Sequence, residues 1–379
     1  MLAAAVLLQL CLGGIYAWSA LVEPMRAQLG YSAAATQVVF GAVFATFTLS
    51  MLISGRLLDR VGPRPLAVVG GLLLLAGYTL AATGGASFWP ALLGVGLLGG
   101  LAIGCGYPAA IAAPARWFPA RAGLVTGISV AGYGGGAVVA TPLYERLLSD
   151  GLGVPELLLR VGLGYGALVV CCGALLALPR GKAAAPPPSV DRWRLLSDRR
   201  FWQLFIAFFC GNLPGLLVIG NLKPLGISMG APPAVAAAAI MALSLGNCGG
   251  RVLWGALFDR LGARRAVTAS LLLVLGAGAL MLIGGSSPPL FVASALLTGL
   301  GFASCLVLHA AQVMRLWGAR RFGSVYGVVI LAHGAGAVCG PPLGGLSRDL
   351  LGSYTPGMVL ALAVAAAGLL AYRALEPRA

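Results

Sequence analysis

The sequence predicts an all-α membrane protein in which twelve transmembrane helices form two six-helix bundles related by a pseudo-two-fold axis. Three observations lead to this fold class. Of the 379 residues, 59% are hydrophobic and only 9% are charged, whereas about a quarter of the residues of a soluble domain are charged. The apolar residues fall into twelve runs, each long enough to cross a bilayer. One long polar segment divides these runs into six and six.

The apolar runs are predicted to be helices rather than strands. A transmembrane strand has about ten residues and alternates apolar with polar side chains, but these runs are about twice as long and apolar all round. The first run lacks the basic start of a signal peptide, so we expect it to be a retained span. The predicted spans are 2–24, 33–56, 65–84, 88–114, 122–144, 157–178, 201–222, 232–256, 266–285, 288–314, 323–346 and 355–374.

The polar segment 179–200 is predicted to be a linker on the cytoplasmic side. It separates an N-terminal bundle, residues 1–178, from a C-terminal bundle, residues 201–379. An ungapped comparison of the two halves at an offset of 200 keeps one register from the first helix to the eleventh, which favours duplication. Matching positions include Pro24, Gly30, Gly55, Asp59, Arg60, Gly62, Arg64 and Arg121, which recur as Pro224, Gly230, Gly255, Asp259, Arg260, Gly262, Arg264 and Arg321.

The distribution of basic residues predicts the orientation in the membrane. A net charge of +15 would suggest nucleic-acid binding in a soluble protein, but most Lys and Arg residues fall on the side that carries the linker and both termini. Basic loops are typically cytoplasmic. We therefore expect both termini inside a bacterial-type plasma (inner) membrane, and we do not expect nucleic acid as a partner.

Several motifs resemble those of a known family. The stretches GRLLDRVGPRP at 55–65 and GALFDRLGARR at 255–265 resemble the loop motif of the major facilitator superfamily. The stretches GGIYAWSALVEPM, ARWFPARAGLVTGISVAGYGGGA and GSVYGVVILAHGAGAVCGPPLGG are similar to the oxalate/formate antiporter and monocarboxylate transporter branch. The resemblance covers essentially the whole chain. It implies a secondary active transporter of small organic anions that works by rocker-switch alternating access.

The two loop motifs are interpreted as a conformational latch. Each places one Asp and several Arg where adjacent helices meet at the cytoplasmic surface, and such a charge cluster can hold the two halves in one state. The latch residues are Asp59, Arg60, Arg64, Asp259, Arg260 and Arg264.

Arg251 is the principal candidate for substrate binding. A charged side chain inside a span is costly and usually functional, although Arg251 could instead extend to the lipid headgroups. Its repeat counterpart is Met51, so the fold itself does not require a charge there. The predicted cores hold no Asp or Glu to neutralise it. A guanidinium without a protein counter-charge favours a carboxylate, which accepts its planar fork with both oxygens. The resemblance also implies a substrate-binding Arg at this point.

Other polar side chains of the spans are expected to converge on the same site. Gln9, Gly13 and Tyr16 share one face of the first helix, and the tenth carries a second stripe of Thr298, Cys305, His309 and Gln312. Each Tyr or Asn could also serve only as a hydrogen-bond partner between helices. Tyr133 and His333 hold equivalent repeat positions and are expected to face each other. The predicted substrate-binding residues are Arg251, Tyr16, Tyr107, Tyr133, Asn212, Asn247 and His333.

The two histidines, His309 and His333, are candidates for proton coupling because imidazole titrates near neutral pH. The alternative is a neutral imidazole that donates to a backbone carbonyl. In the branch that this chain resembles, oxalate exchangers pair the Arg with a Lys of the eleventh helix. Span 323–346 has no Lys, and His333 is its nearest basic group. We therefore favour a monocarboxylate such as L-lactate, moved with a proton.

Other classes of function find little support. The sequence has no HExxH motif, no pair of intramembrane acids and no nucleotide-binding loop, so we do not expect an enzyme or an ATP-driven pump. The eight cysteines lie in predicted spans without a CxxC motif, and we expect no metal, cofactor or disulfide.

The expected partners are a small carboxylate, a proton and membrane lipid, and the expected state is a monomer. An oxalate/formate-type exchanger, an exchanger of phosphorylated or dicarboxylic metabolites, and a non-transporting membrane sensor remain alternatives.

Overall fold

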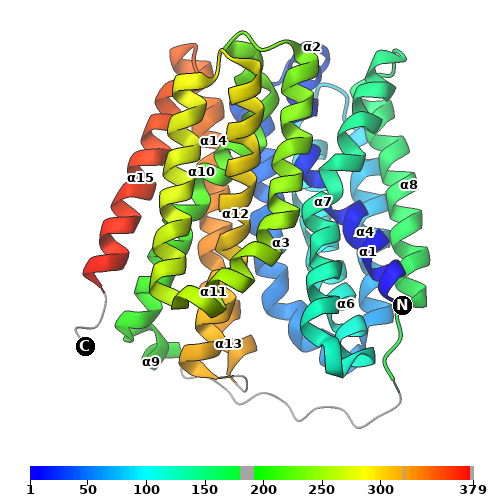
Figure 1. The fold of residues 1–379 in the computed structure, drawn as a ribbon. Coiled ribbons are helices and arrows are strands. Elements are labelled where there is room, and N and C mark those ends of the chain that lie inside the picture. The colour runs from blue at the N-terminus through cyan, green and yellow to red at the C-terminus, as the bar shows by residue number, and fades with distance from the viewer. Residues whose placement is uncertain (180–191, 319–320, 376–379) are drawn as a thin grey trace.

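The computed structural model describes residues 1–179, 192–318 and 321–375, and within these ranges the chain forms helices and no strands (Figure 1). Most of the linker predicted at 179–200 lies outside the described residues. Its last part includes the short helix α9 (Arg192–Leu196). The all-α architecture predicted from the apolar runs is therefore confirmed.

The helices follow the predicted spans in order. The N-terminal half contains α1 (Leu2–Gly13), η1 (Gly14–Ala17), α2 (Ser19–Leu29), α3 (Ala33–Val61), α4 (Pro63–Thr83), α5 (Phe88–Ala91), η2 (Leu92–Gly99), α6 (Gly100–Trp117), η3 (Pro119–Arg121), α7 (Ala122–Ser149) and α8 (Val154–Leu175). The C-terminal half contains α10 (Arg199–Ser228), α11 (Pro233–Gly284), α12 (Pro288–Trp317), α13 (Phe322–Val329), α14 (Leu331–Leu351) and α15 (Thr355–Ala374). Many helices extend several residues beyond the predicted spans, because the sequence boundaries were set at charged residues that the helix termini accommodate.

The number of membrane spans depends on how two bent elements are counted. In the described part of the chain, ten helices are long and apolar enough to cross a membrane, and α1 to α2, bent by 54°, form an eleventh span. Helix α11 has 52 residues and would be about 78 Å long if it were straight, more than twice the thickness of the hydrocarbon layer. If α11 is counted as two spans, the number reaches the predicted twelve.

Helix α11 is broken at Gly262, in the second copy of the loop motif. Gly262 has φ 76° and ψ 166°, which is not helical. Gly62, 200 residues earlier, has φ 82° and ψ 174° and separates α3 from α4. Positive φ favours glycine because it has no Cβ. Gly30 and Gly230, which are also separated by 200 residues, share positive φ values of 72° and 91°. The repeat found in the sequence is therefore present in the backbone conformation.

The two ends of the helical body are distinguished by these glycines. We call the end that holds Gly62 and Gly262 the motif side; α9 and α13 lie there, at the bottom of Figure 1. The other end, which holds Gly30, Gly230 and Asp349, is called the Asp349 side.

The bundles meet mainly along two helix pairs, α3 with α14 and α7 with α11. The two pairs are equivalent in the repeat: adding 200 to the residue numbers of α3 leads to the first part of α11, and subtracting 200 from those of α14 leads to α7. A pseudo-two-fold axis requires this equivalence. Small residues allow close contact: a Cβ on Gly41 would lie 2.5 Å from the carbonyl oxygen of Ala337, and one on Gly134 would lie 3.2 Å from the backbone of Cys248. The site described below lies between these two pairs.

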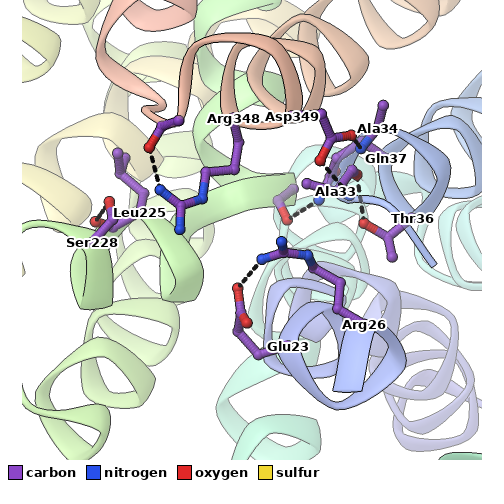
Figure 2. A network of polar contacts seen from close by, with 12 residues as sticks. Glu23, Arg26, Ala33, Ala34, Thr36, Gln37, Leu225, Ser228, Arg348 and Asp349 are labelled. Atoms are coloured by element: carbon purple, nitrogen blue, oxygen red, sulfur yellow. Dashed lines mark hydrogen bonds and ion pairs between the residues drawn. The ribbon is translucent and has the colours of Figure 1, made fainter. Parts of the chain in front are cut away.

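Polar contacts join the bundles at the Asp349 side. Asp349, near the end of α14, accepts hydrogen bonds from the backbone nitrogens of Ala33 (3.0 Å) and Ala34 (2.8 Å) in the first turn of α3 (Figure 2). A carboxylate at this position satisfies free N–H groups and interacts favourably with the helix dipole. Nearby, Lys223 of α10 forms an ion pair with Glu145 of α7. Both contacts cross from one bundle to the other.

Candidate functional site

Arg251 lies at the interface between the two bundles. It belongs to α11, eleven residues before the break at Gly262, which is about 16 Å along the helix axis. The side chain is only 5% exposed. Its Nη1 donates a long hydrogen bond of 3.4 Å to the hydroxyl of Tyr107 on α6, and its Cζ lies 5.9 Å from the centre of the Tyr133 ring on α7. Arg251 therefore points toward the N-terminal bundle and does not extend to the headgroups.

The guanidinium of Arg251 has no acidic partner among the described residues. Its Nε and Nη2 are buried and without any hydrogen-bond partner in that part of the chain. These two nitrogens share one edge of the planar group and carry parallel N–H bonds, a geometry that fits the two oxygens of one carboxylate. Because an unpaired buried charge is costly, this arrangement favours an anion as ligand.

Aromatic rings from both bundles surround this position, and we call them the aromatic cluster. The ring centroid of Tyr133 lies 5.2 Å from that of Tyr16 and 5.1 Å from that of Tyr107, both in edge-to-face geometry. This geometry is favourable for aromatic pairs. The cluster consists of Tyr16, Phe44, Phe47, Tyr107, Tyr133, Phe302 and His333. Its first five members belong to the N-terminal bundle and the last two to the C-terminal bundle.

The repeat-related residues Tyr133 and His333 both belong to this cluster, but among the described residues each ring contacts Phe47 and not the other ring. The ring centroid of Phe47 is 6.4 Å from the ring centroids of both, so the two residues are linked through Phe47. Tyr133 and His333 are 1% and 0% exposed.

The position of Tyr16 depends on a local change in helix type. At Gly13 the first helix lies so close to α7 that a Cβ would collide with the carbonyl oxygen of Tyr133, and a Cβ on Gly136 would collide with Gly13. The chain then tightens into the 3₁₀ turn η1 before α2. Gln9, Gly13 and Tyr16 are all buried, but the 3₁₀ turn changes the helical register that the sequence predicted for Tyr16.

Buried polar atoms without partners accumulate around Arg251. The hydroxyls of Tyr16 and Tyr133 and both amide atoms of Asn247 make no hydrogen bond of good geometry with the described residues, although Tyr16 lies close to both Asn247 and Tyr133. Asn247 lies one turn before Arg251 on α11 and is 0% exposed. Buried polar side chains in proteins are nearly always hydrogen-bonded. Several unsatisfied groups beside one unpaired cation therefore indicate a ligand-binding site.

Asn212 has a different environment from the one predicted. Its Nδ2 donates to the backbone oxygen of His333 (3.3 Å), and its Oδ1 lies 3.0 Å from the His333 Nδ1. Both residues are 0% exposed. Asn212 of α10 is thus engaged with His333 of α14 on both sides of its amide, while the Nε2 of His333 has no partner in the described chain.

His309 contacts Phe208 and the backbone of its own helix. Its Nδ1 is 2.7 Å from the carbonyl oxygen of Cys305, and its ring stacks on Phe208 with a centroid distance of 4.5 Å. The Phe208 ring also packs against His333, with a centroid distance of 6.0 Å. Gln312, in the same predicted stripe, donates to the hydroxyl of Tyr372 at 2.9 Å. His309 and Gln312 are buried, and the ring of His309 connects to the aromatic cluster through Phe208.

The predicted latch residues are all exposed at the motif side: Asp59, Arg60, Arg64, Asp259, Arg260 and Arg264. Asp59 forms an ion pair of 3.2 Å with Arg116 of α6, which sequence reasoning did not select. Both residues belong to the N-terminal bundle, so this pair does not join the bundles.

Sequence reasoning also missed the phenylalanines of the site. Phe40, Phe44 and Phe47 follow the i, i+4, i+7 spacing of one helix face, and this spacing could have indicated an aromatic stripe on α3. Phe302 on α12 carries no comparable signal. In the described residues, no group of three His, Cys, Asp or Glu side chains is placed to hold a metal ion.

Comparisons with known proteins place the chain among membrane transporters. A model of the Major Facilitator Superfamily matches residues 3–243 and 216–379. The oxalate:formate antiporter of Oxalobacter formigenes is 29% identical over 377 residues, which cover 94% of this chain and 87% of that protein. Monocarboxylate transporter 13 of Rattus norvegicus is 29% identical over 327 residues, with coverages of 83% and 74%.

Solved structures of two transporters share the fold. The nucleoside transporter NupG aligns with a TM-score of 0.77 at 15% identity, covering 99% of this chain and 98% of that one. A D-xylose–proton symporter aligns with a TM-score of 0.73 at 13% identity, covering 99% and 96%. At these identities the likeness concerns the fold.

Proposed function

Because this chain belongs to the major facilitator superfamily, we propose that it is a secondary active transporter of small organic anions, and that its substrate is a monocarboxylate such as L-lactate, moved with a proton. The substrate binds between the bundles at Arg251, and the bundles rock about it to open the site to one side of the membrane at a time. The protein does this as a monomer in lipid, without metal or cofactor.

The observation that carries this proposal is the state of the Arg251 guanidinium. It is buried at the bundle interface, has no acidic partner in the described chain, and presents Nε and Nη2 as two parallel free donors. A carboxylate satisfies both donors and neutralises the charge in one contact. A neutral substrate such as a sugar would leave the charge uncompensated.

The remaining groups of the site favour a small ligand. The hydroxyls of Tyr16 and Tyr133 and the amide of Asn247 supply hydrogen bonds around the carboxylate, and the aromatic cluster limits the space beside it. Relatives whose names state a monocarboxylate or oxalate and formate as substrates support this substrate class.

Proton coupling is assigned to His333 rather than to His309. The Nε2 atoms of both histidines are buried without a partner in the described chain, but the ring of His333 packs in the aromatic cluster, whereas that of His309 stacks on Phe208. When protonated at Nε2, His333 carries the transported proton beside the bound carboxylate.

Exchange of oxalate against formate is the second candidate function. It is favoured by the 29% identity to an oxalate:formate antiporter. Oxalate carries two carboxylates and requires a second permanent cation, but α14 has no Lys. We therefore rank a monocarboxylate first.

The direction of access follows from the loops. We assign the motif side to the cytoplasm because basic loops are typically cytoplasmic, and the Asp349 side to the outside. The contacts of Asp349 and Lys223 join the bundles on the outside in this conformation, so they must break before substrate reaches the site from that side. The loop motifs containing Asp59 and Asp259 then act as a latch in the opposite conformation.

The test is uptake of labelled lactate, formate and oxalate into proteoliposomes, with and without a pH gradient. We expect lactate uptake that is driven by an inward proton gradient, is lost in Arg251→Ala, and loses its dependence on the gradient in His333→Gln. Uptake of oxalate only against internal formate would favour the second candidate. Absence of any uptake in folded protein would favour a sensor, and transport of a neutral sugar by Arg251→Ala would contradict the proposed substrate class.

A further inference from the structure

The amide of Asn212 faces His333 in only one chemically consistent orientation. The backbone oxygen of His333 is purely an acceptor, so the Asn212 atom 3.3 Å from it must be the Nδ2 donor. The other end of the amide, Oδ1, then lies 3.0 Å from the His333 Nδ1. Because Oδ1 is purely an acceptor, Nδ1 must carry a hydrogen. The second nitrogen of a neutral imidazole then has a lone pair and no hydrogen.

We propose that Asn212 is a positioning residue that holds His333 in the Nδ1–H tautomer, so that the buried Nε2 is the atom that takes up the transported proton. This inference rests on the proposed function, since it assigns the proton to one atom of that same site. Asn212 itself does not touch the substrate. It acts through His333, by fixing both its tautomer and the orientation of its ring.

The surroundings of His333 make its Nε2 the available atom. Apolar rings pack against the imidazole: Phe44 and Phe47 of α3, Phe208 of α10 and Phe302 of α12. None of them can exchange a proton or accept a strong hydrogen bond. In the described chain the Nε2 is buried and without a partner, while the Nδ1 is already engaged with Asn212.

The charged and titratable groups that face His333 are few. Arg251 of α11 is near enough to interact with it electrostatically. His309 of α12 lies behind the Phe208 ring, and Tyr107 and Tyr133 of the N-terminal bundle lie beyond the Phe47 ring. No carboxylate of the described chain forms an ion pair with any of these residues.

This arrangement couples a carboxylate to a proton. A neutral His333 carries a lone pair on its unpartnered Nε2, and this lone pair repels a carboxylate oxygen placed beside it. Once Nε2 is protonated it becomes a donor, but two cations, the imidazolium and Arg251, then share a poorly solvated site. A carboxylate between them stabilises both. Binding of the anion and binding of the proton therefore strengthen each other, and by linkage the effect is reciprocal.

Asn221 provides a matched control. It also lies on α10, is 0% exposed, and donates from Nδ2 to Leu217 (2.9 Å) and to the backbone oxygen of Pro341 on α14 (3.2 Å). It thus bridges the same two helices as Asn212 but contacts no histidine. Loss of either amide weakens the α10–α14 contact, and only loss of Asn212 should alter His333.

The first experiment requires no variant at position 212. The chain contains only two histidines, so protein labelled with ¹⁵N-histidine and purified through a histidine-free tag gives two imidazole spin systems by NMR, and His309→Gln assigns them. We expect neutral His333 to show a protonated Nδ1 and an unprotonated Nε2. The opposite tautomer in the folded wild type overturns the proposal. This readout does not depend on transport, so it remains decisive even if the protein carries no carboxylate.

The second experiment compares the pH profile of lactate uptake in wild type, Asn212→Asp, Asn212→Ala and Asn221→Ala. The Asp variant keeps an acceptor beside Nδ1 and adds a negative charge, which favours the imidazolium, so the midpoint should move up by ~1 pH unit or more. In Asn212→Ala the NMR signals should show both tautomers and the proton dependence should weaken. Asn221→Ala should keep the wild-type midpoint and tautomer. Indistinguishable profiles for Asn212→Asp, Asn221→Ala and wild type overturn the proposal, and Asn212→Asp still tests it if Asn212→Ala does not fold.

Discussion

Replacement of Arg251 separates a ligand-binding role from a structural one. In Arg251→Met, position 251 takes the residue that occupies its repeat counterpart, Met51. A buried cation without a partner destabilises the fold, and the contacts that the substitution removes are one long hydrogen bond to Tyr107 and one cation–π contact with Tyr133. We therefore expect the ligand-free Met variant to melt at a temperature equal to or above that of the wild type, with lactate uptake abolished.

The size of the functional effect follows from the two free donors of Arg251. Nε and Nη2 can each donate one charge-assisted hydrogen bond to a carboxylate, and such bonds contribute about 1.5–3 kcal/mol each. Arg251→Gln, which retains a polar side chain without the charged fork, should lose ~3–6 kcal/mol of binding, or ~10²- to 10⁴-fold in affinity. Arg251→Lys keeps the charge but lacks the parallel pair, so we expect about half of that free energy to be lost.

The assay is concentration-dependent uptake of labelled lactate in proteoliposomes, together with thermal melting of the ligand-free protein in detergent. Arg146→Gln is the control, because Arg146 is an exposed Arg that pairs with Asp150 directly after the end of its helix. The reasoning is refuted if Arg251→Met lowers the melting temperature by several degrees while uptake persists, since Arg251 would then be a structural residue.

Three further predictions concern the helix interface, the Asp349 side and His309. Gly134→Ala should reduce transport about tenfold or more, because a Cβ there would lie 3.2 Å from the Cys248 backbone and 3.3 Å from the Arg251 Nε. The control Gly135→Ala, whose Cβ would meet one atom at 4.0 Å, should transport normally. Equal activity of the two variants would contradict this prediction. Asp349→Asn should weaken closure of its side by ~1 kcal/mol, measured as a larger population with long distances between spin labels across that side, whereas Asp150→Asn should not. His309→Gln should keep the dependence of uptake on the pH gradient, and its loss would transfer the proton role to His309.

The fold could be predicted because its signals are local and repeated. Each span is a continuous apolar run, and the membrane permits few alternatives to a helix for such a run. The duplicated motif located the breaks, since Gly62 and Gly262 share one backbone conformation. The bend at η1 could not be predicted, because it depends on how closely Gly13 approaches Tyr133, which is a contact between distant segments.

The candidate site could be predicted only in part, for a comparable reason. Arg251 is conspicuous in a sequence because a charge inside a span is rare, and Met51 at the counterpart position showed that the fold does not need it. Phe47 was missed because its spacing with Phe40 and Phe44 indicates an aromatic stripe on α3 but does not show whether that stripe faces the site or the lipid. Asn212 was selected as a polar residue in a span, but its engagement with His333 depends on the packing of α10 against α14.

The central claim is that a carboxylate binds the unpaired guanidinium of Arg251. The most direct measurement compares the binding of L-lactate and of L-lactamide, its neutral amide analogue of nearly the same shape, to purified wild type and Arg251→Gln by calorimetry. We predict that the wild type prefers lactate by about a hundredfold or more and that Arg251→Gln loses this preference. Equal binding of the two ligands by the wild type, or an unchanged preference in Arg251→Gln, would contradict the claim.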